Sequence, residues 1–135
     1  MNKINKINKN FFKDSHYIID LKLCSIRLID NCKFPWIILI PNRKNKTDIT
    51  DLNSKDQILL MKEIVHCSKL MKKIFKTSKL NVEKIGNQVP QLHIHIIARF
   101  KKDSTWPLSV WVIKGKSYTK KALGETISKL NKVFK

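Results

Sequence analysis

The sequence predicts an α+β domain with a mostly antiparallel sheet of about five strands, a central helix and a C-terminal helix. Two observations support this fold class. Short runs rich in β-branched residues come in pairs, and two segments with the apolar periodicity of a helix lie between and after these pairs. A length of 135 residues fits one domain. We expect that domain to span residues 13–135, after a flexible basic tail over residues 1–12 whose Asn-Lys-Ile repeat is too polar to pack.

Four segments carry strand patterns. Leu23–Ile29 alternates and contains β-branched residues, and after a turn at residues 30–33 the apolar run Trp36–Ile40 is typical of a buried strand. Together they predict a hairpin. Leu80–Ile85 and Gln91–Phe100 predict a second pair, joined by a tight connection over residues 87–90 that Pro90 closes.

Two segments carry helical patterns. Over Ser54–Phe75, apolar residues recur on one face at Leu60, Ile64, Cys67, Met71 and Ile74. Ser54 and Gln57 predict a capping box at the start of this helix. Thr119–Phe134 has a similar stripe of Leu123, Ile127, Leu130 and Phe134.

The net charge of +18 favours polyanionic partners, although Lys, Asn and Ile are all abundant, as in a composition drifting toward A/T-rich codons. Binding to nucleic acid through this charge is therefore an alternative, not the expected function. The lysines are scattered through every segment, so they predict no single basic patch.

The remaining composition indicates where the protein works. Three cysteines, an odd number without a CxxC spacing, predict free thiols. The apolar runs are too short to span a bilayer, and the N-terminus has no signal-peptide pattern, so we expect a cytoplasmic protein with no membrane partner.

Gln91-Leu92-His93-Ile94-His95-Ile96-Ile97 is the segment with the clearest chemical content. In a strand, Gln91, His93 and His95 would share one face. The pair of histidines has four interpretations: structural side chains, metal ligands, general acid–base groups, or a nucleophile with a helper. No Cys, Asp or Glu flanks the pair, which weakens the metal interpretation. His16 and His66 have no such neighbours and are expected to be solvated.

The nucleophilic interpretation follows from imidazole chemistry. With an unperturbed pKa of ~6.5, a histidine is largely neutral at pH 7 and can attack phosphorus without a strong base. A backbone carbonyl that accepts the N–H of one ring nitrogen would leave the other free. The second histidine could donate to phosphoryl oxygens or protonate a leaving group.

These residues resemble the histidine triad (HIT) family, whose mark is His-φ-His-φ-His-φ-φ, with φ apolar, on a strand after a polar loop. The segment Gly86–Ile97 matches this layout with Gln91 in place of the first histidine. It is similar in particular to a bacterial branch with Val-Pro-Gln-Leu-His before the site and Trp-Pro after it. The resemblance covers roughly residues 13 to 130, with Leu23-Cys24, the run Pro35–Pro41 and Trp106-Pro107 in the expected order.

The resemblance implies roles for particular residues. His93 would be the nucleophile, and His95 would contact the phosphate or leaving group. The implied substrate-binding positions are Asp30 for the ribose hydroxyls, Asn81, Asn87 and Gln88 for the α-phosphate and leaving group, and Gln91, whose carbonyl would orient His93. Trp36 stands where many members have a further histidine.

The implied function is hydrolysis or transfer of nucleotidyl groups from nucleoside 5′-phosphoryl substrates, such as phosphoramidates and dinucleoside polyphosphates, through a nucleotidyl-histidine intermediate. The implied protein is a homodimer that needs no metal or other cofactor. The loss of the first triad histidine at Gln91 leaves a second hypothesis open, a nucleotide-binding or sensing module with little turnover. The third hypothesis is RNA association through the lysines.

Overall fold

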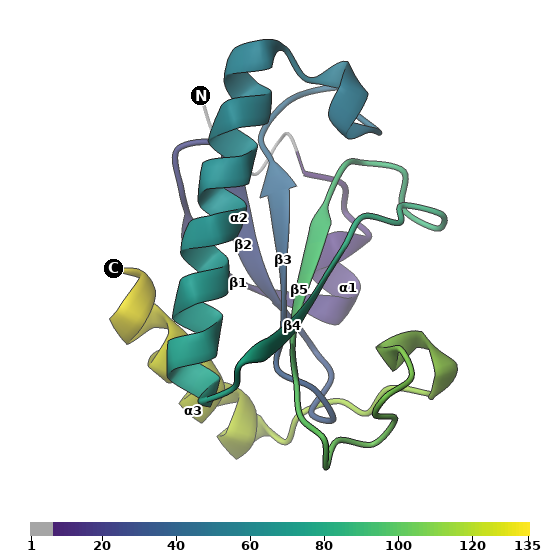
Figure 1. Cartoon of the computed structure of the whole chain (residues 1–135), viewed down its shortest axis with the longest axis vertical. Coiled ribbons are helices and arrows are strands. Elements are labelled where there is room, and N and C mark those ends of the chain that lie inside the picture. Colours follow the sequence, from purple (N-terminus) through teal and green to yellow (C-terminus); the bar gives the residue numbers. More distant parts are fainter. Residues whose placement is uncertain (1–6) are drawn as a thin grey trace.

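The computed structural model describes residues 7–135 and contains a five-stranded antiparallel sheet of order β1-β2-β3-β5-β4 (Figure 1). The predicted fold class is confirmed. The strands are β1 (Ser15–Asp20), β2 (Cys24–Ile29), β3 (Trp36–Pro41), β4 (Lys79–Glu83) and β5 (Ile94–Arg99). Three of the four predicted strands agree with these bounds within two residues, whereas the last begins at Ile94 instead of Gln91.

The helices cover the two faces of the sheet unequally. The long α2 (Ser54–Phe75) and the C-terminal α3 (Lys120–Phe134) pack on one face, and the single-turn α1 (Phe11–Asp14) lies on the other (Figure 1). Two short 3₁₀ turns, Ile49–Asp51 and Val110–Val112, complete the structure. In the described part of the chain, no helix is long and apolar enough to cross a membrane.

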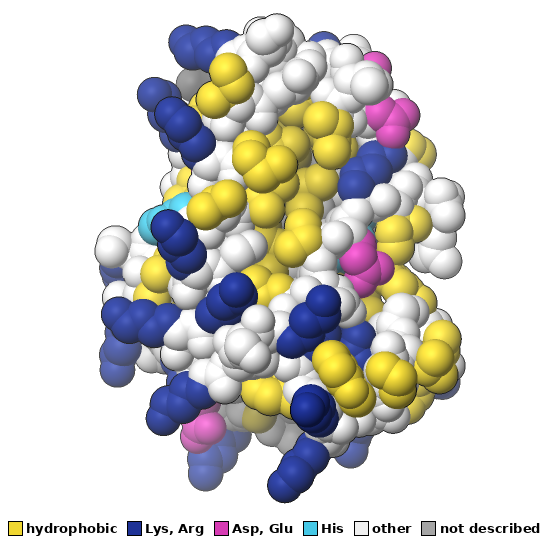
Figure 2. Space-filling view, in the orientation of Figure 1, with side chains coloured by type: hydrophobic (Ala, Val, Ile, Leu, Met, Phe, Trp, Pro, Cys, Tyr) yellow, Lys and Arg dark blue, Asp and Glu magenta, His cyan; other side chains and the backbone are white. Residues whose placement is uncertain are grey.

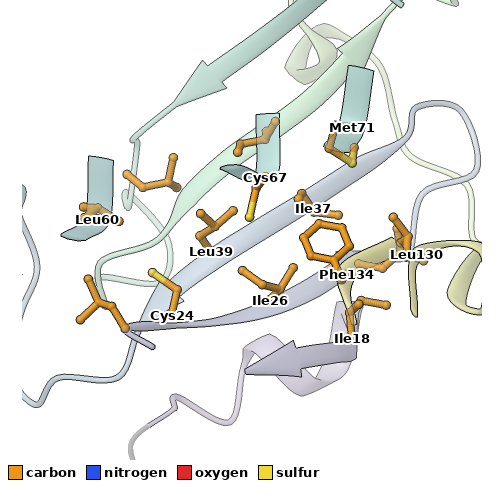
Figure 3. Packing of buried hydrophobic residues seen from close by; sticks show 14 of the residues in the cluster. Ile18, Cys24, Ile26, Ile37, Leu39, Leu60, Cys67, Met71, Leu130 and Phe134 are labelled. Atoms are coloured by element: carbon orange, nitrogen blue, oxygen red, sulfur yellow. The ribbon is translucent and has the colours of Figure 1, made fainter. Parts of the chain in front are cut away.

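The core between the sheet and the two long helices is built from alternate strand residues and one stripe of each helix. Figure 3 shows Ile26, Ile37 and Leu39 of the sheet facing Cys67 and Met71 of α2. Cys24 and Cys67 are buried free thiols, as the sequence predicts, and Cys32 is an exposed one. The second, smaller cluster lies on the opposite face of the sheet and contains Ile7, Phe11, Phe34, Trp36, Ile38, Ile40, Ile97 and Val110.

The start of α2 differs from the prediction. Asn53, not Ser54, is the N-cap, and its side chain accepts a hydrogen bond of 2.8 Å from the backbone N–H of Asp56. The predicted capping box of Ser54 and Gln57 is wrong, because the Gln57 amide donates to the carbonyl of Leu52, before the cap. The sequence does not distinguish the two positions, since Asn and Ser are equally favourable N-cap residues.

The N-terminal segment contains structure that the composition did not indicate. The expected flexible tail falls partly on residues 1–6, which lie outside the described residues. Within residues 7–12, Ile7 and Phe11 are only 8% and 4% exposed. The strand β1 follows directly and pairs with β2 with an irregularity between Tyr17 and Ile19, which obscures the alternation in its sequence.

A buried ion pair fixes the loop that follows β5. Arg99 donates to Asp103 through Nε at 2.8 Å and through Nη2 at 3.1 Å, and both side chains are at most 4% exposed. Asp103 also accepts from the backbone N–H groups of Phe100, Thr105 and Trp106. This network holds a loop that leads to Trp111, which reaches back toward the sheet.

Candidate active site

His93 and His95 lie beside each other where β5 begins. Their ring centroids are 4.8 Å apart, with the planes inclined at 68°. Both side chains are buried, at 7% and 5% exposure. Since β5 starts at Ile94, His93 ends the connection and His95 belongs to the strand. The two imidazoles therefore share one environment but are held by different parts of the backbone.

His93 is oriented by the backbone carbonyl of Gln91. The distance from His93 Nδ1 to the Gln91 oxygen is 2.7 Å. A carbonyl only accepts, so Nδ1 carries the proton and Nε2 keeps its lone pair. Burial lowers the pKa of His93, and the hydrogen bond to Gln91 opposes this shift only in part. The geometry thus provides a neutral imidazole with one nucleophilic nitrogen.

His95 is oriented by an indole. Trp36 Nε1 donates to His95 Nδ1 at 3.0 Å. Burial, followed by the neighbouring His93, lowers the pKa of His95 to about 3. His95 is therefore neutral at physiological pH, and its remaining nitrogen, Nε2, carries the proton.

The two histidines line a cavity of about 370 Å³, a size typical of small-molecule sites. One wall is the loop Gly86–Val89, which turns through Gly86 at a φ of 71°, a conformation that strains other residues. Aromatic rings form much of the rest: Phe11 lies edge-on to His93 at 4.8 Å, and Trp111 lies 5.3 Å from His95. The other lining residues are Asp14, Ile29, Trp36, Ile38 and Ile85.

Two of the five predicted substrate-binding residues, Asn87 and Gln88, line this cavity, and both are exposed. The other three side chains are not among its described lining residues. Asp30 accepts from the Tyr118 N–H at 2.9 Å, and Asn81 accepts from Arg99 at 2.6 Å. The Gln91 side chain accepts from the Asn8 N–H at 2.7 Å, and the Gln91 carbonyl holds His93.

The sequence does not identify every residue that lines the cavity, and Phe11, Asp14 and Trp111 are among those that it leaves out. Phe11 lies within the predicted tail of residues 1–12 and Asp14 follows it, and the adjacent aromatic residues Phe11-Phe12 are the sequence feature that indicates packing there. Asp14 is an exposed residue, but desolvation raises the pKa of its carboxyl. Trp111 comes from a distant loop, and nothing in its local sequence places it at the histidines.

Among residues 7–135, no group of three or more His, Cys, Asp or Glu side chains is arranged to hold a metal ion. The lining residues instead combine two neutral imidazoles, the carboxyl of Asp14, amides and aromatic rings. Such a set suits a ligand with an aromatic part and hydrogen-bonding oxygens.

Comparison with known proteins defines the class. Residues 10–102 match the HIT domain, and the chain therefore belongs to the histidine triad family. This is a nucleotide-binding family that includes hydrolases and transferases. A search of curated proteins gave no match.

Solved structures agree with this assignment. The chain is similar to a histidine triad protein from Bradyrhizobium japonicum, with 37% identity, 94% of this chain and 96% of that chain covered, and a TM-score of 0.90. A histidine triad protein from Marinobacter aquaeolei VT8 has 31% identity, covering 94% and 93% of the two chains, at the same TM-score of 0.90. The diadenosine triphosphate hydrolase of Plasmodium falciparum shares the fold at 19% identity and a TM-score of 0.60, with 94% and 76% covered.

Proposed function

We propose that this protein hydrolyses or transfers nucleotidyl groups from nucleoside 5′-phosphoryl substrates, such as phosphoramidates and dinucleoside polyphosphates, through a nucleotidyl-His93 intermediate. The observation that carries the proposal is the 2.7 Å contact between His93 Nδ1 and the Gln91 carbonyl. It leaves Nε2 as the nucleophilic atom without the help of a separate base. A Gln at position 91 supplies this carbonyl as well as a histidine would.

The reaction has two steps. The lone pair of His93 Nε2 attacks the α-phosphorus, and the bond to the leaving group breaks, with its electron pair leaving on that group. Water or another acceptor then attacks phosphorus, the P–N bond to His93 breaks, and the nucleotide is released. The Nε2–H of His95 and the amides of Asn87 and Gln88 are suited to donate to the phosphoryl oxygens.

The test is a search for the intermediate. The protein is mixed briefly with adenosine phosphoramidate or a diadenosine polyphosphate, quenched in denaturant at neutral to alkaline pH, and weighed intact. We expect a mass increase of one adenylyl group that maps to His93. A product-forming enzyme without any adduct under single-turnover conditions would contradict a covalent intermediate.

A second candidate function is a nucleotide-binding or sensing module with little turnover. It is favoured by the low pKa of His95, about 3, together with Gln91 in place of a histidine, because both remove proton carriers from the site. Calorimetry would then show binding of nucleoside monophosphate while hydrolysis stays at the background rate. Slow turnover that is lost in a His93 variant would instead support the catalytic function.

Two carboxylates, Asp30 and Asp14, are candidates to bind the ribose hydroxyls of the nucleotide. The family resemblance implies Asp30, whose carboxylate accepts from Tyr118 N–H and lies 3.6 Å from His16. Asp14 instead lines the cavity beside His93. We expect Asp14→Asn to weaken nucleotide binding ~10-fold, because a charge-assisted hydrogen bond to a hydroxyl becomes a neutral one. Calorimetry on Asp14→Asn and Asp30→Asn decides, and a larger loss for Asp30→Asn would restore the role that the resemblance implies.

We also propose that the protein is a homodimer formed through α2 and β4. Ile58, Met61 and Val65 lie at i, i+3 and i+7 on α2 and are between 44% and 60% exposed, and Val82 on β4 is 49% exposed. Figure 2 shows hydrophobic side chains gathered in the centre of the face that α2 and β4 present. Since β4 is an edge strand, a two-fold partner could continue the sheet and cover this apolar face.

If this face is the dimer interface, a charge introduced into it should weaken self-association. Met61→Glu should weaken self-association ~10-fold or more, because a carboxylate and its symmetry copy would be buried in an apolar contact. Sedimentation velocity over a concentration series measures this change. Leu108→Glu is the matched control, because Leu108 is as exposed as Met61, at 60% against 59%, and lies outside α2 and β4. Equal weakening by both variants would contradict this interface.

We propose a cytoplasmic location, which is consistent with the free thiols of Cys24, Cys32 and Cys67. The net charge of +18 draws anionic nucleotides toward the protein. RNA association through the same charge would show as binding that weakens steeply with salt, whatever the sequence.

A further inference from the structure

Trp36 makes a contact with His95 that has chemical consequences. The indole Nε1 donates to His95 Nδ1 at 3.0 Å, and the Trp36 residue is only 5% exposed. The ring of Trp111 lies 5.3 Å from that of His95 and 5.0 Å from that of Trp36, nearly perpendicular to both. The imidazole is therefore enclosed by two indoles and by His93.

An indole nitrogen can donate a hydrogen bond but cannot accept one. A proton on His95 Nδ1 would point at the N–H of Trp36, and no other acceptor for it is present among the described contacts of this atom. The imidazolium form would lose this hydrogen bond and replace it with a repulsive contact in a buried place. A histidine at position 36 would have no such restriction, because its ring can either donate or accept.

The charged and titratable groups around His95 do not offset this restriction. The nearest is His93, which opposes protonation of its neighbour. Glu83 lies opposite His95 in the β4–β5 register, but its Oε1 accepts from Trp111 Nε1 at 2.8 Å. Asp14 lines the cavity, where its electrostatic influence is on His93. The pKa of about 3 for His95 is consistent with this arrangement.

We propose that Trp36 is a positioning residue that holds His95 as a neutral Nε2–H donor, and that the site therefore favours nucleotidyl substrates whose leaving group departs as a stable anion. This inference rests on the proposed function and narrows its substrate class. When a phosphoanhydride reacts, the P–O bond breaks and its electron pair stays on a phosphate oxygen, which needs no proton. When a phosphoramidate of an alkyl amine reacts, the P–N bond breaks and the nitrogen must receive a proton as it leaves. A neutral imidazole is too weak an acid to supply it.

The kinetic test compares leaving groups on the same adenylyl group. The substrates are diadenosine polyphosphate, the p-nitrophenyl ester of AMP and an alkylamine phosphoramidate of AMP. For the wild-type protein, we expect kcat/KM for the two anionic leaving groups to exceed that for the amine ~100-fold or more, the usual size of a missing general acid. In Trp36→His, this ratio should fall by ~10-fold or more, because His95 can then be protonated.

Trp111→His is the matched control. This indole also touches His95 but donates to Glu83. We expect Trp111→His to leave the ratio between leaving groups as in wild type, whatever happens to the individual rates. A wild-type ratio near one, or the same change of ratio in both variants, would overturn the leaving-group half of the proposal.

A spectroscopic measurement tests the positioning half without any turnover. In ¹⁵N NMR of labelled imidazoles, His95 should show an unprotonated Nδ1 and a protonated Nε2, unchanged between about pH 5 and pH 8. In Trp36→Phe, the Nδ1 resonance should move, because its donor is gone. A protonated Nδ1 in wild type, or no change in Trp36→Phe, would overturn the role of Trp36. If no substrate reacts at all, the proposed function fails together with the leaving-group preference, and the spectra still decide the tautomer.

Discussion

Replacing His93 by alanine should reduce nucleotide release ~10³-fold or more, because the reaction loses its only proposed nucleophile. The side chain is almost fully buried against Phe11 and His95, so the substitution also leaves a small cavity. The measurement is kcat for AMP release from a diadenosine polyphosphate, with folding checked by circular dichroism. His66→Ala, on the exposed side of α2, is the control and should keep wild-type turnover. Equal rates for wild type and His93→Ala would refute the nucleophile.

The pH dependence of the reaction rate is a second, independent test of His93 as the nucleophile. Burial lowers the pKa of His93 below the ordinary value of 6.5, so the neutral, nucleophilic form persists at pH values where a solvated histidine is protonated. The rate should therefore stay level as the pH falls through 6.5 and decline only at more acidic pH. A decline centred at or above 6.5 would mean that a different group limits the reaction.

The second large effect is on stability. Arg99→Ala should lower the free energy of unfolding by ~3–5 kcal/mol, because it leaves the carboxylate of Asp103 buried without its cation. Arg99 also donates to Asn81 of β4 and to the Leu108 carbonyl in the loop after β5, so the substitution removes these hydrogen bonds as well. Denaturant titration measures the loss. Lys84→Ala removes the exposed pair with Asp48 and should cost ~1 kcal/mol or less.

The same ion pair gives the stability a dependence on acid pH. Burial alone would raise the pKa of Asp103, but Arg99 and three backbone N–H groups lower it to about 2, below the ordinary value of 3.8. A depressed carboxyl pKa stabilises the folded state above 3.8, and this contribution is lost as the pH falls from there toward 2. The Arg99→Ala variant should show a smaller change in unfolding free energy over this interval.

The sequence predicted those parts of the fold that depend on local patterns. The period of two around His93 and His95, the helical stripe of Leu60, Cys67 and Met71, and the pairing of strands were all readable because neighbours in the sequence share one surface. The strand β1 was missed because it follows an Asn- and Lys-rich segment and contains an irregular register.

The parts of the site that could not be predicted depend on contacts between distant segments. The hydrogen bond from Trp36 to His95 spans 59 positions and follows from the register between β3 and β5, which no local pattern reveals. Asp14 and Trp111 likewise reach the cavity from segments far from the histidines in the sequence. The resemblance to the family implies a role for the Gln91 carbonyl, but only the structure shows that the Gln91 side chain binds elsewhere, to the N–H of Asn8.

Residues 7–12 contact the candidate active site, so the functional domain includes them. Phe11 packs on His93, and the N–H of Asn8 binds the side chain of Gln91, whose carbonyl orients the same histidine. A chain shortened to begin at residue 13, as composition alone would recommend, loses both contacts while keeping every strand of the sheet. Such a truncation would be well folded by spectroscopy and yet defective at His93, so purification tags and fusion partners belong at the C-terminus of this protein.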